Sequence, residues 1–313
     1  MTTQKTLQAT IMAGVISLGL ASSALAQKSL YVTTNALPSA PYDTWATGFN
    51  SLQAALDYAK QGDTIYLAGH EFAGGTTGLA HPADAVFVWR NGTNIVLRGG
   101  YEASSLLAPG EHPGPRDVDL WPTVLTRTGG VARIFSLITV TNCTIEMVTI
   151  SGGYQTVSQF RGAGVYLSKS YDVTFSQSRI VDNIISDATR IGPPQGGGLY
   201  LESSTLTISE CEINNNQAAA FSPGVKSAQG GAIYVDGTSR LTVNKSLISG
   251  NKAEAHFGTG AGGGVYVTTG ANASIFETVL SNNQATRNGG ALDGLGGAIA
   301  NIGKLSLTGK LFT

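Results

Sequence analysis

Two carboxylates recur at a fixed spacing in the second half of the chain and could act together. Glu202 and Asp236 are 34 residues apart, and each follows a tyrosine by two residues within a recurring glycine-rich phrase. Stacked one repeat apart, they approach the separation of about 5 Å used by retaining glycosidases, and they could also begin a calcium site. The alternative is a solvated pair that only repels. Ser168 and Thr268 occupy the same column, and the repeat brings no histidine, arginine or third acid to it.

Four tyrosines in the same phrase could contact a ligand. They are Tyr166, Tyr200, Tyr234 and Tyr266. If the phrase is a strand, alternation points these rings away from the core, and stacked repeats align them as one aromatic stripe. An exposed stripe of this kind could stack against the ring faces of a sugar chain. The alternative is that the loops before each glycine pair fold over the stripe and bury it.

No other residues have the spacing of a catalytic or metal site. The histidines lie in loops without metal-ligand spacing, at His70, His81, His112 and His256. There is no Ser-His-Asp arrangement and no phosphate-binding loop followed by lysine, and the Gly-Gly-Gly runs lack the βαβ context of a nucleotide site. We therefore expect no metal site and no cofactor, with calcium the one ion left open.

The glycine-rich phrase organises the chain. Its five copies begin at Gly162, Gly196, Gly230, Gly262 and Gly296, at intervals of 32 to 34 residues. A fixed period of this length indicates a solenoid or a propeller built by stacking one unit on the next. A second phrase ends each unit on an asparagine, at Asn183, Asn216, Asn251 and Asn283. Three strands and one asparagine turn per unit are typical of a parallel β-helix coil and not of a propeller blade.

The apolar residues beside each tyrosine should face inward and stack into columns. They are Val165, Leu167, Leu199, Leu201, Ile233, Val235, Val265 and Val267. The recurring asparagines can form a ladder, because equivalent side chains on neighbouring coils lie about 4.8 Å apart. Asparagine also tolerates the left-handed backbone of a tight turn. We therefore predict an all-β parallel solenoid.

The chain before the regular repeats predicts a cap and irregular first coils. In the N-terminal cap, residues 27–84, two short strands flank an amphipathic helix that begins near Asn50 or Ser51 and ends by Gly62. We expect this helix to cover the open end of the first coil. Residues 85–134 form the first coils with a proline-rich insertion, whose charged residues should solvate it. These are Glu111, Arg116, Asp117 and Asp119. Residues 135–313 form the regular coils.

Composition excludes some function classes. Of 313 residues only 12% are charged, the formal net charge is −1, and 41 are glycine. No basic patch could neutralise phosphates, so we expect no nucleic-acid partner. Cys143 and Cys211 fall in different columns of the repeat, which favours two small buried thiols over a disulfide, although export would permit a bridge.

The first residues of the chain predict export. Residues 1–26 combine Lys5, an apolar run over 11–20 and a final Ala24-Leu25-Ala26, a pattern typical of a cleavable secretory signal. A membrane anchor is the alternative.

The repeat spacing places the next ladder asparagine beyond Thr313, so we expect the last coil to be incomplete. A missing part would then hold further coils and any membrane anchor.

The two repeated phrases resemble the GGA[ILV] and FxxN repeats of the polymorphic membrane protein family of bacterial autotransporter adhesins. Here Ile or Leu stands where that family has Phe. The segments Thr44-Trp45, 51–56 and 62–66 resemble the opening of secreted right-handed β-helix proteins of the pectin-lyase-like superfamily. This resemblance implies a right-handed parallel β-helix solenoid with an N-terminal capping helix.

The same resemblance implies a protein that is secreted or held at the cell surface (outer membrane) of a bacterium. We expect an adhesin-like or carbohydrate-contacting passenger whose partner is a polysaccharide or a host-surface ligand. One alternative is a polysaccharide lyase or glycoside hydrolase. Such relatives imply calcium with an aspartate cluster and a catalytic arginine, or several clustered aspartates, and neither set can be placed on this chain. The other alternative is a passive structural spacer.

Overall fold

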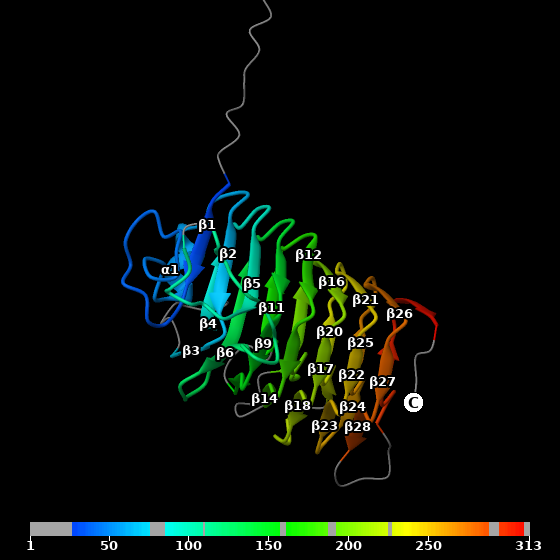
Figure 1. The fold of residues 1–313 in the computed structure, drawn as a ribbon. Helices are drawn as coiled ribbons and strands as arrows, with labels where there is room; N and C mark the ends of the chain where they lie inside the picture. Colours follow the sequence, from blue (N-terminus) through cyan, green and yellow to red (C-terminus); the bar gives the residue numbers. More distant parts are fainter. Residues whose placement is uncertain are drawn as a thin grey trace, which may run out of the picture.

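The chain folds as a parallel β-solenoid, seen from the side in Figure 1. The computed structural model describes residues 27–75, 85–108, 110–156, 161–186, 192–224, 227–287 and 294–309. The expected signal at 1–26 and His81 lie outside this range. Within the described residues, no helix is long and apolar enough to cross a membrane.

Each regular coil contributes one strand to each of four parallel sheets, in the chain order C, A, B, D. Sheet A contains β1 (Ser29–Val32), β2 (Thr64–Ala68), β5 (Val96–Tyr101), β8 (Thr144–Glu146), β12 (Val173–Ser176), β16 (Thr205–Ser209), β21 (Arg240–Asn244), β26 (Asn272–Phe276) and β30 (Lys304–Thr308). Sheet B contains β3 (Glu71–Gly74), β6 (Thr123–Arg127), β9 (Val148–Ser151), β13 (Arg179–Val181), β17 (Glu212–Asn214), β22 (Leu247–Ser249) and β27 (Val279–Ser281).

Sheets C and D complete the coil. Sheet C contains β4 (Ala85–Arg90), β7 (Arg133–Ile138), β11 (Val165–Ser168), β15 (Leu199–Glu202), β20 (Ile233–Val235), β25 (Val265–Val267) and β29 (Ile299–Asn301). Sheet D contains β10 (Tyr154–Gln155), β14 (Ile184–Ser186), β18 (Gln217–Ala220), β23 (Lys252–Ala255) and β28 (Gln284–Arg287). A further pair joins β19 (Ser227–Gln229) and β24 (Thr259–Ala261).

Sheet D corrects the expectation of three strands per unit. Its strands follow the ladder asparagines directly, and the alanine-rich sequences of β18 and β23 have low β-propensity, so they do not stand out in the sequence. They nevertheless pair in register, with Ala218 opposite Ala253. Ala218 and Ala220 of β18 and Ala255 of β23 belong to a second, smaller core that is separate from the main one.

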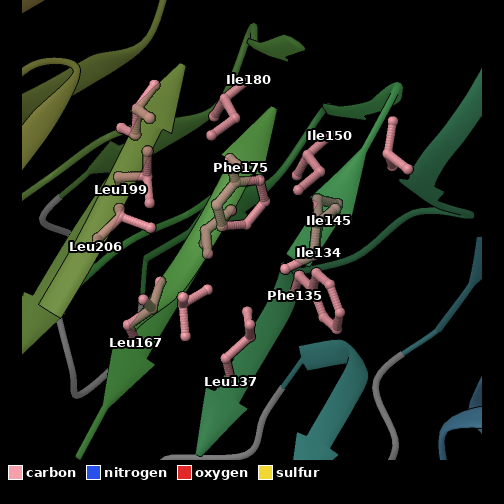
Figure 2. Packing of buried hydrophobic residues seen from close by; sticks show 14 of the residues in the cluster. Ile134, Phe135, Leu137, Ile145, Ile150, Leu167, Phe175, Ile180, Leu199 and Leu206 are labelled. Carbon is pink, nitrogen blue, oxygen red and sulfur yellow. The ribbon is translucent and has the colours of Figure 1, made fainter. Parts of the chain in front are cut away.

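The main core consists of apolar columns that run the length of the solenoid. Leu137, Leu167 and Leu201 are equivalent residues on three successive coils. Figure 2 shows such side chains pointing inward from sheets A, B and C, and within sheet A Phe175 lies opposite Ile145 on one neighbouring strand and Ile208 on the other. All eight residues predicted to face inward beside the tyrosines are fully buried, so that prediction is confirmed.

The asparagine ladder is also confirmed. The Nδ2 atom of Asn183 donates to Oδ1 of Asn216 at 2.9 Å, Asn216 donates to Asn251 at 3.0 Å, and Asn251 donates to Asn283 at 2.9 Å. Each of these amides also donates to a main-chain carbonyl of the preceding coil. The ladder therefore satisfies turn carbonyls inside the solenoid, which would be costly to leave unpaired.

The predicted left-handed backbone lies one residue earlier than the ladder asparagines. Positive φ angles occur at Asp182 (56°), Asn215 (55°), Gly250 (65°) and Asn282 (54°). The ladder residue itself must point its amide inward along the stack, so the residue before it makes the turn. The identities at that position suit it, since Asp, Asn and Gly adopt this conformation most readily.

Two ladders of small polar side chains were not foreseen. Ser170, Ser204 and Ser239 each accept a hydrogen bond from a main-chain N–H of the preceding coil. A second column does the same and consists of Ser178, Cys211, Ser246 and Thr278. Cys211 therefore takes a serine position. Both cysteines are free and buried, which confirms the preference for separate thiols over a disulfide.

Helix α1 (Leu52–Tyr58) covers the N-terminal end of the stack, as expected. The Ser51 hydroxyl accepts a hydrogen bond from Ala54 N–H and caps the helix. Leu52 faces the main core. On the same helix, the Gln53 amide donates to the Val88 carbonyl and accepts from Val88 N–H, both at 2.8 Å. Helix α1 thus closes part of the edge of β4, the first strand of sheet C.

The charged residues of the proline-rich insertion do more than solvate it, which corrects that prediction. Arg116 is mostly buried, donates to Glu146 at 3.2 Å and to the Gly99 carbonyl at 2.8 Å, and stacks over Tyr101 at 5.1 Å. The Asp117 and Glu111 carboxylates accept main-chain N–H groups of their own turns. These contacts fasten the insertion across sheet A.

Candidate functional site

The four tyrosines form one stacked column on sheet C. Tyr166, Tyr200, Tyr234 and Tyr266 pair directly across β11, β15, β20 and β25. Successive ring centroids are 5.9, 4.9 and 5.4 Å apart, and the last two pairs are parallel. The column therefore exists as the repeat predicts, with its rings in contact with one another.

The column is covered and not exposed. Tyr166 and Tyr200 are 2% exposed and Tyr234 is 8% exposed, while Tyr266 is partly buried. The guanidinium groups of Arg133 and Arg161 lie 4.6 Å from the Tyr166 ring and 5.1 Å from the Tyr200 ring. Arg161 belongs to the segment before a glycine pair, so the alternative of a buried stripe is correct for these rings. They have no free face on which a sugar could stack.

The buried hydroxyls are also weaker acids than an exposed tyrosine. Burial raises the pKa of Tyr166 and of Tyr200 above the usual value, and it raises the pKa of Tyr234 to about 12. These tyrosines stay protonated at neutral pH. Their chemistry is therefore that of hydrogen-bond donors.

Glu202 is the centre of a polar network on this column. Its carboxylate accepts hydrogen bonds from the Tyr166 hydroxyl at 2.5 Å, from the Ser168 hydroxyl at 2.8 Å and from Nη1 of Arg161 at 2.5 Å. The expectation that no arginine converges on Glu202 is wrong. Arg161 directly precedes the glycine phrase that begins at Gly162 and pairs with Gln195 of the next coil, so its column is in register with the repeat, but the equivalent residues of the other coils are not arginine.

The surroundings of Glu202 do not suit acid catalysis. Burial raises its pKa, but the hydrogen bonds from Tyr166 and Ser168 and the charge of Arg161 outweigh burial, so the net pKa lies below the ordinary value. A glycosidase acid needs the opposite shift, because it must hold a proton at working pH. Glu202 instead remains an ionised acceptor that ties two coils together.

Asp236 lies on the next coil, just after β20. Its carboxylate accepts from Thr238 N–H at 3.4 Å, within its own turn. Among the described residues, no group of three or more His, Cys, Asp or Glu side chains is placed to hold a metal ion. Calcium binding, which the sequence left open, therefore has no candidate set of three such side chains in this part of the chain.

An exposed aromatic cluster on the sheet D side was missed in the sequence. We call Phe221, His256 and Phe257 the aromatic edge. Phe221 is 40% exposed and Phe257 is 51% exposed, and the His256 ring lies between them at centroid distances of 4.7 and 6.4 Å. Phe221 follows β18 and His256 follows β23, and His256 N–H donates to the Ala220 carbonyl. The cluster therefore spans two neighbouring coils.

Polar groups border the aromatic edge. The side chain of Glu254 is 9% exposed and accepts from Nζ of Lys252 at 2.7 Å and from Nε2 of Gln217 at 3.1 Å. It also lies 3.8 Å from Nε2 of His256. Exposed rings beside ordered donors and acceptors can stack on an apolar sugar face and bind its hydroxyls.

Nothing in the repeat marks these residues, because they lie just beyond the strand ends, where coil lengths differ. The other described histidines have structural contacts. His70 forms hydrogen bonds with Thr33 and Thr34, and His112 packs against Tyr31.

The comparison with protein families agrees with the geometry of the coils. The model of the right-handed beta helix region matches residues 127–303, which is more than half of the chain. The chain belongs to this family. The predicted right-handed parallel β-helix is thereby confirmed for this beta-helix protein.

Two other comparisons add little to that assignment. Among solved structures, the beta-helix protein is similar to a crystal structure of alginate lyase from Paenibacillus sp. str. FPU-7. The two chains share 16% sequence identity at a TM-score of 0.33, with 90% of this chain and 99% of that chain covered. No curated protein sequence matches significantly.

Proposed function

We propose that this beta-helix protein is exported and acts as an adhesin-like, carbohydrate-contacting passenger at the bacterial surface or outside the cell. The observation that carries the proposal is the aromatic edge, in which Phe221 and Phe257 remain exposed on consecutive coils. Exposed aromatic clusters are uncommon on a protein surface unless they contact a partner. The partner we propose is a polysaccharide.

The polar surroundings support a sugar over an apolar partner. Lys252, Gln217 and Glu254 are held in place by one another beside the rings. A sugar offers a C–H face to the rings and hydroxyls to these donors and acceptors, so both halves of the site would be used. A purely apolar partner would instead remove the partly exposed Lys252 side chain from water without a new hydrogen bond, which is unfavourable.

The test is binding of the purified protein to a panel of acidic and neutral polysaccharides, with and without calcium. Retention on at least one polysaccharide is expected, and the double variant F221A/F257A should bind about tenfold more weakly, since each stacked ring contributes about 0.5–1.5 kcal/mol. Tyr171→Ala is the matched control, because Tyr171 is an equally exposed aromatic residue (47%) on another corner of the coil.

Two outcomes would count against the proposal. If no polysaccharide retains the protein, carbohydrate binding is contradicted. If Tyr171→Ala loses as much affinity as F221A/F257A, the aromatic edge is not the binding site. New reducing or unsaturated ends in the same samples would indicate a hydrolase or a lyase instead of a binding protein. Export is checked separately, by sequencing the N-terminus of the secreted protein, which should begin at Gln27.

A further inference from the structure

The outer face of sheet A carries a column of hydroxyl side chains on successive strands, from β8 to β30 (Figure 1). The in-register pairing places these residues directly opposite one another. They are Thr144, Thr174, Thr207, Thr242, Ser274 and Ser306. A second column stands two residues further along the strands and contains, from β12 onward, Ser176, Ser209, Asn244, Phe276 and Thr308. We call the two columns from β12 to β30 the hydroxyl array.

The hydroxyls of the first column face water. Thr174, Thr207 and Thr242 are partly exposed, while the residues that follow them, such as Phe175 and Ile208, are fully buried in the core. Within the described part of the chain, the hydroxyls of this column form no hydrogen bond with a protein group. The inward serine ladders differ, because their hydroxyls bond from coil to coil. The first column therefore keeps its donors and acceptors for a partner outside the protein.

The spacing of the hydroxyl array is regular in two directions. Neighbouring parallel strands lie about 4.8 Å apart, and alternate residues on one strand lie about 6.6 Å apart. The register does not shift between β12 and β30, so both columns are straight. The threonine side chains are also stiff, since branching at Cβ restricts χ1. The face therefore presents its hydroxyls as a fixed two-dimensional lattice.

The hydroxyl array is uncharged and has charges only along its borders. Asp172 directly precedes β12 and Arg240 begins β21, whereas Glu210 and Lys245 directly follow β16 and β21. A charged partner would thus meet both signs of charge along each border. A neutral partner that covers the array itself meets hydroxyls, one amide and one aromatic ring. The charge distribution favours a neutral partner.

Among neutral partners, the lattice favours one that repeats in two directions. Water oxygens on the prism face of hexagonal ice repeat on the same two length scales as the strands and the alternate residues of the array. A hydroxyl group donates one hydrogen bond and accepts others, as a water molecule does. Waters held over the array can therefore join the ice surface and bridge it to the protein. A neutral polysaccharide fits less well, because Phe276 is the one ring of the array on which a sugar could stack.

We propose that the hydroxyl array is an ice-binding surface. Protein adsorbed through this face would hold back the growth of ice between the bound molecules, so that seeded crystals freeze only below their melting temperature. This proposal goes beyond carbohydrate contact at the aromatic edge. The two sites lie on different sheets and use different residues, so either can fail without the other.

The test is slow growth of ice from a solution of the purified whole protein, with serum albumin present as a protein that ice excludes. The beta-helix protein should be enriched in the ice and should lower the freezing temperature of seeded crystals below their melting temperature. Thr207→Lys places a charge near the centre of the array. It should reduce uptake into ice by at least about tenfold, because the ice lattice solvates an ammonium group poorly.

Ser274→Lys and Ser281→Lys form a matched pair on one coil. Ser274 belongs to the array on β26, whereas Ser281 ends β27 of sheet B. Uptake into ice should fall for Ser274→Lys and stay unchanged for Ser281→Lys, and melting temperatures of the variants check that each is folded. The proposal is overturned if the unmodified protein stays in the liquid with albumin, or if the two serine variants lose uptake equally. Retention on crystalline cellulose without uptake into ice would also overturn it and indicate a polysaccharide surface.

Discussion

The hydroxyl of Tyr166 donates a hydrogen bond of 2.5 Å to the carboxylate of Glu202, which lies on the next coil of the solenoid. Ser168 and Arg161 bind the same carboxylate. From the sequence, Tyr166 and Glu202 looked like two separate outward-facing groups. In the structure they bond to each other and hold two neighbouring coils together.

Glu202→Gln should destabilise the protein by about 1–2 kcal/mol at neutral pH, because it weakens charge-assisted hydrogen bonds from Tyr166 and Arg161. Urea unfolding of both proteins measures the difference. Glu277→Gln is the matched control, since Glu277 is an exposed glutamate in the turn after β26. A loss as large in the control would show that the network contributes nothing specific.

The Glu202 effect should also depend on pH. Its folded-state pKa lies below the unfolded value of 4.5, so the carboxylate stabilises the fold fully above that value and loses this contribution as pH falls through the folded pKa. The stability difference between the unmodified protein and Glu202→Gln should therefore shrink in acid. Unfolding midpoints measured between pH 7 and pH 3 test this, and a difference that grows in acid would contradict the assignment.

Asn216→Ala should cost about 3 kcal/mol or more, because it leaves several buried groups of the ladder unpaired at once. Asn216 is fully buried, donates to Asn251 and to the Ile180 carbonyl, and accepts from Asn183 N–H. Asn283→Ala should cost less, since Asn283 is only partly buried. Thermal or urea midpoints of the two variants provide the ranking. Equal losses of stability would mean that the contribution of a ladder asparagine does not depend on how deeply it is buried.

Gly231→Ala should be among the most damaging single substitutions. An added Cβ would lie 2.4 Å from the Gly263 carbonyl oxygen and 2.5 Å from the Lys252 carbonyl carbon, and both are main-chain atoms that cannot move aside. We expect a loss above about 3 kcal/mol or failure to accumulate folded protein. Gly75→Ala meets no atom within 4 Å and should change stability by less than about 0.5 kcal/mol.

Both thiols should be unreactive in the native protein. Burial raises the pKa of Cys143 and of Cys211 to about 11, so almost no thiolate exists at pH 8. A thiol reagent should label neither residue until urea is added, and then both. Cys211→Ser should be tolerated better than Cys211→Ala, because serine can accept the hydrogen bond from Ser178 N–H that the sulfur accepts now.

Much of the fold followed from local patterns. The position of α1 followed from the spacing of Leu52, Ala55 and Leu56, and the strand positions in sheets A, B and C followed from period-2 alternation. The fourth sheet did not follow, because its short alanine-rich strands carry a weak local signal. The predicted position of the left-handed residue was wrong by one, because the ladder asparagine points its amide along the stack and the residue before it makes the turn.

The candidate site could be foreseen only in part. The tyrosine column was found because it repeats, but its burial depends on Arg161 and Arg133, which reach it from outside the tyrosine column itself. The aromatic edge was not found in this way, because Phe221, His256 and Phe257 lie just after β18 and β23, outside the two repeated phrases.

By itself, the sequence determined the period, the inward columns and the asparagine ladder. Each of these features belongs to a single coil and recurs when coils stack. Contacts between equivalent residues can therefore be predicted from one repeat, without the rest of the chain. The tertiary structure alone decided which outward side chains are covered and which are exposed. Coverage depends on loops and on α1, whose contacts join residues far apart in sequence and at different points of the period. Exposure is therefore a property of the assembled solenoid.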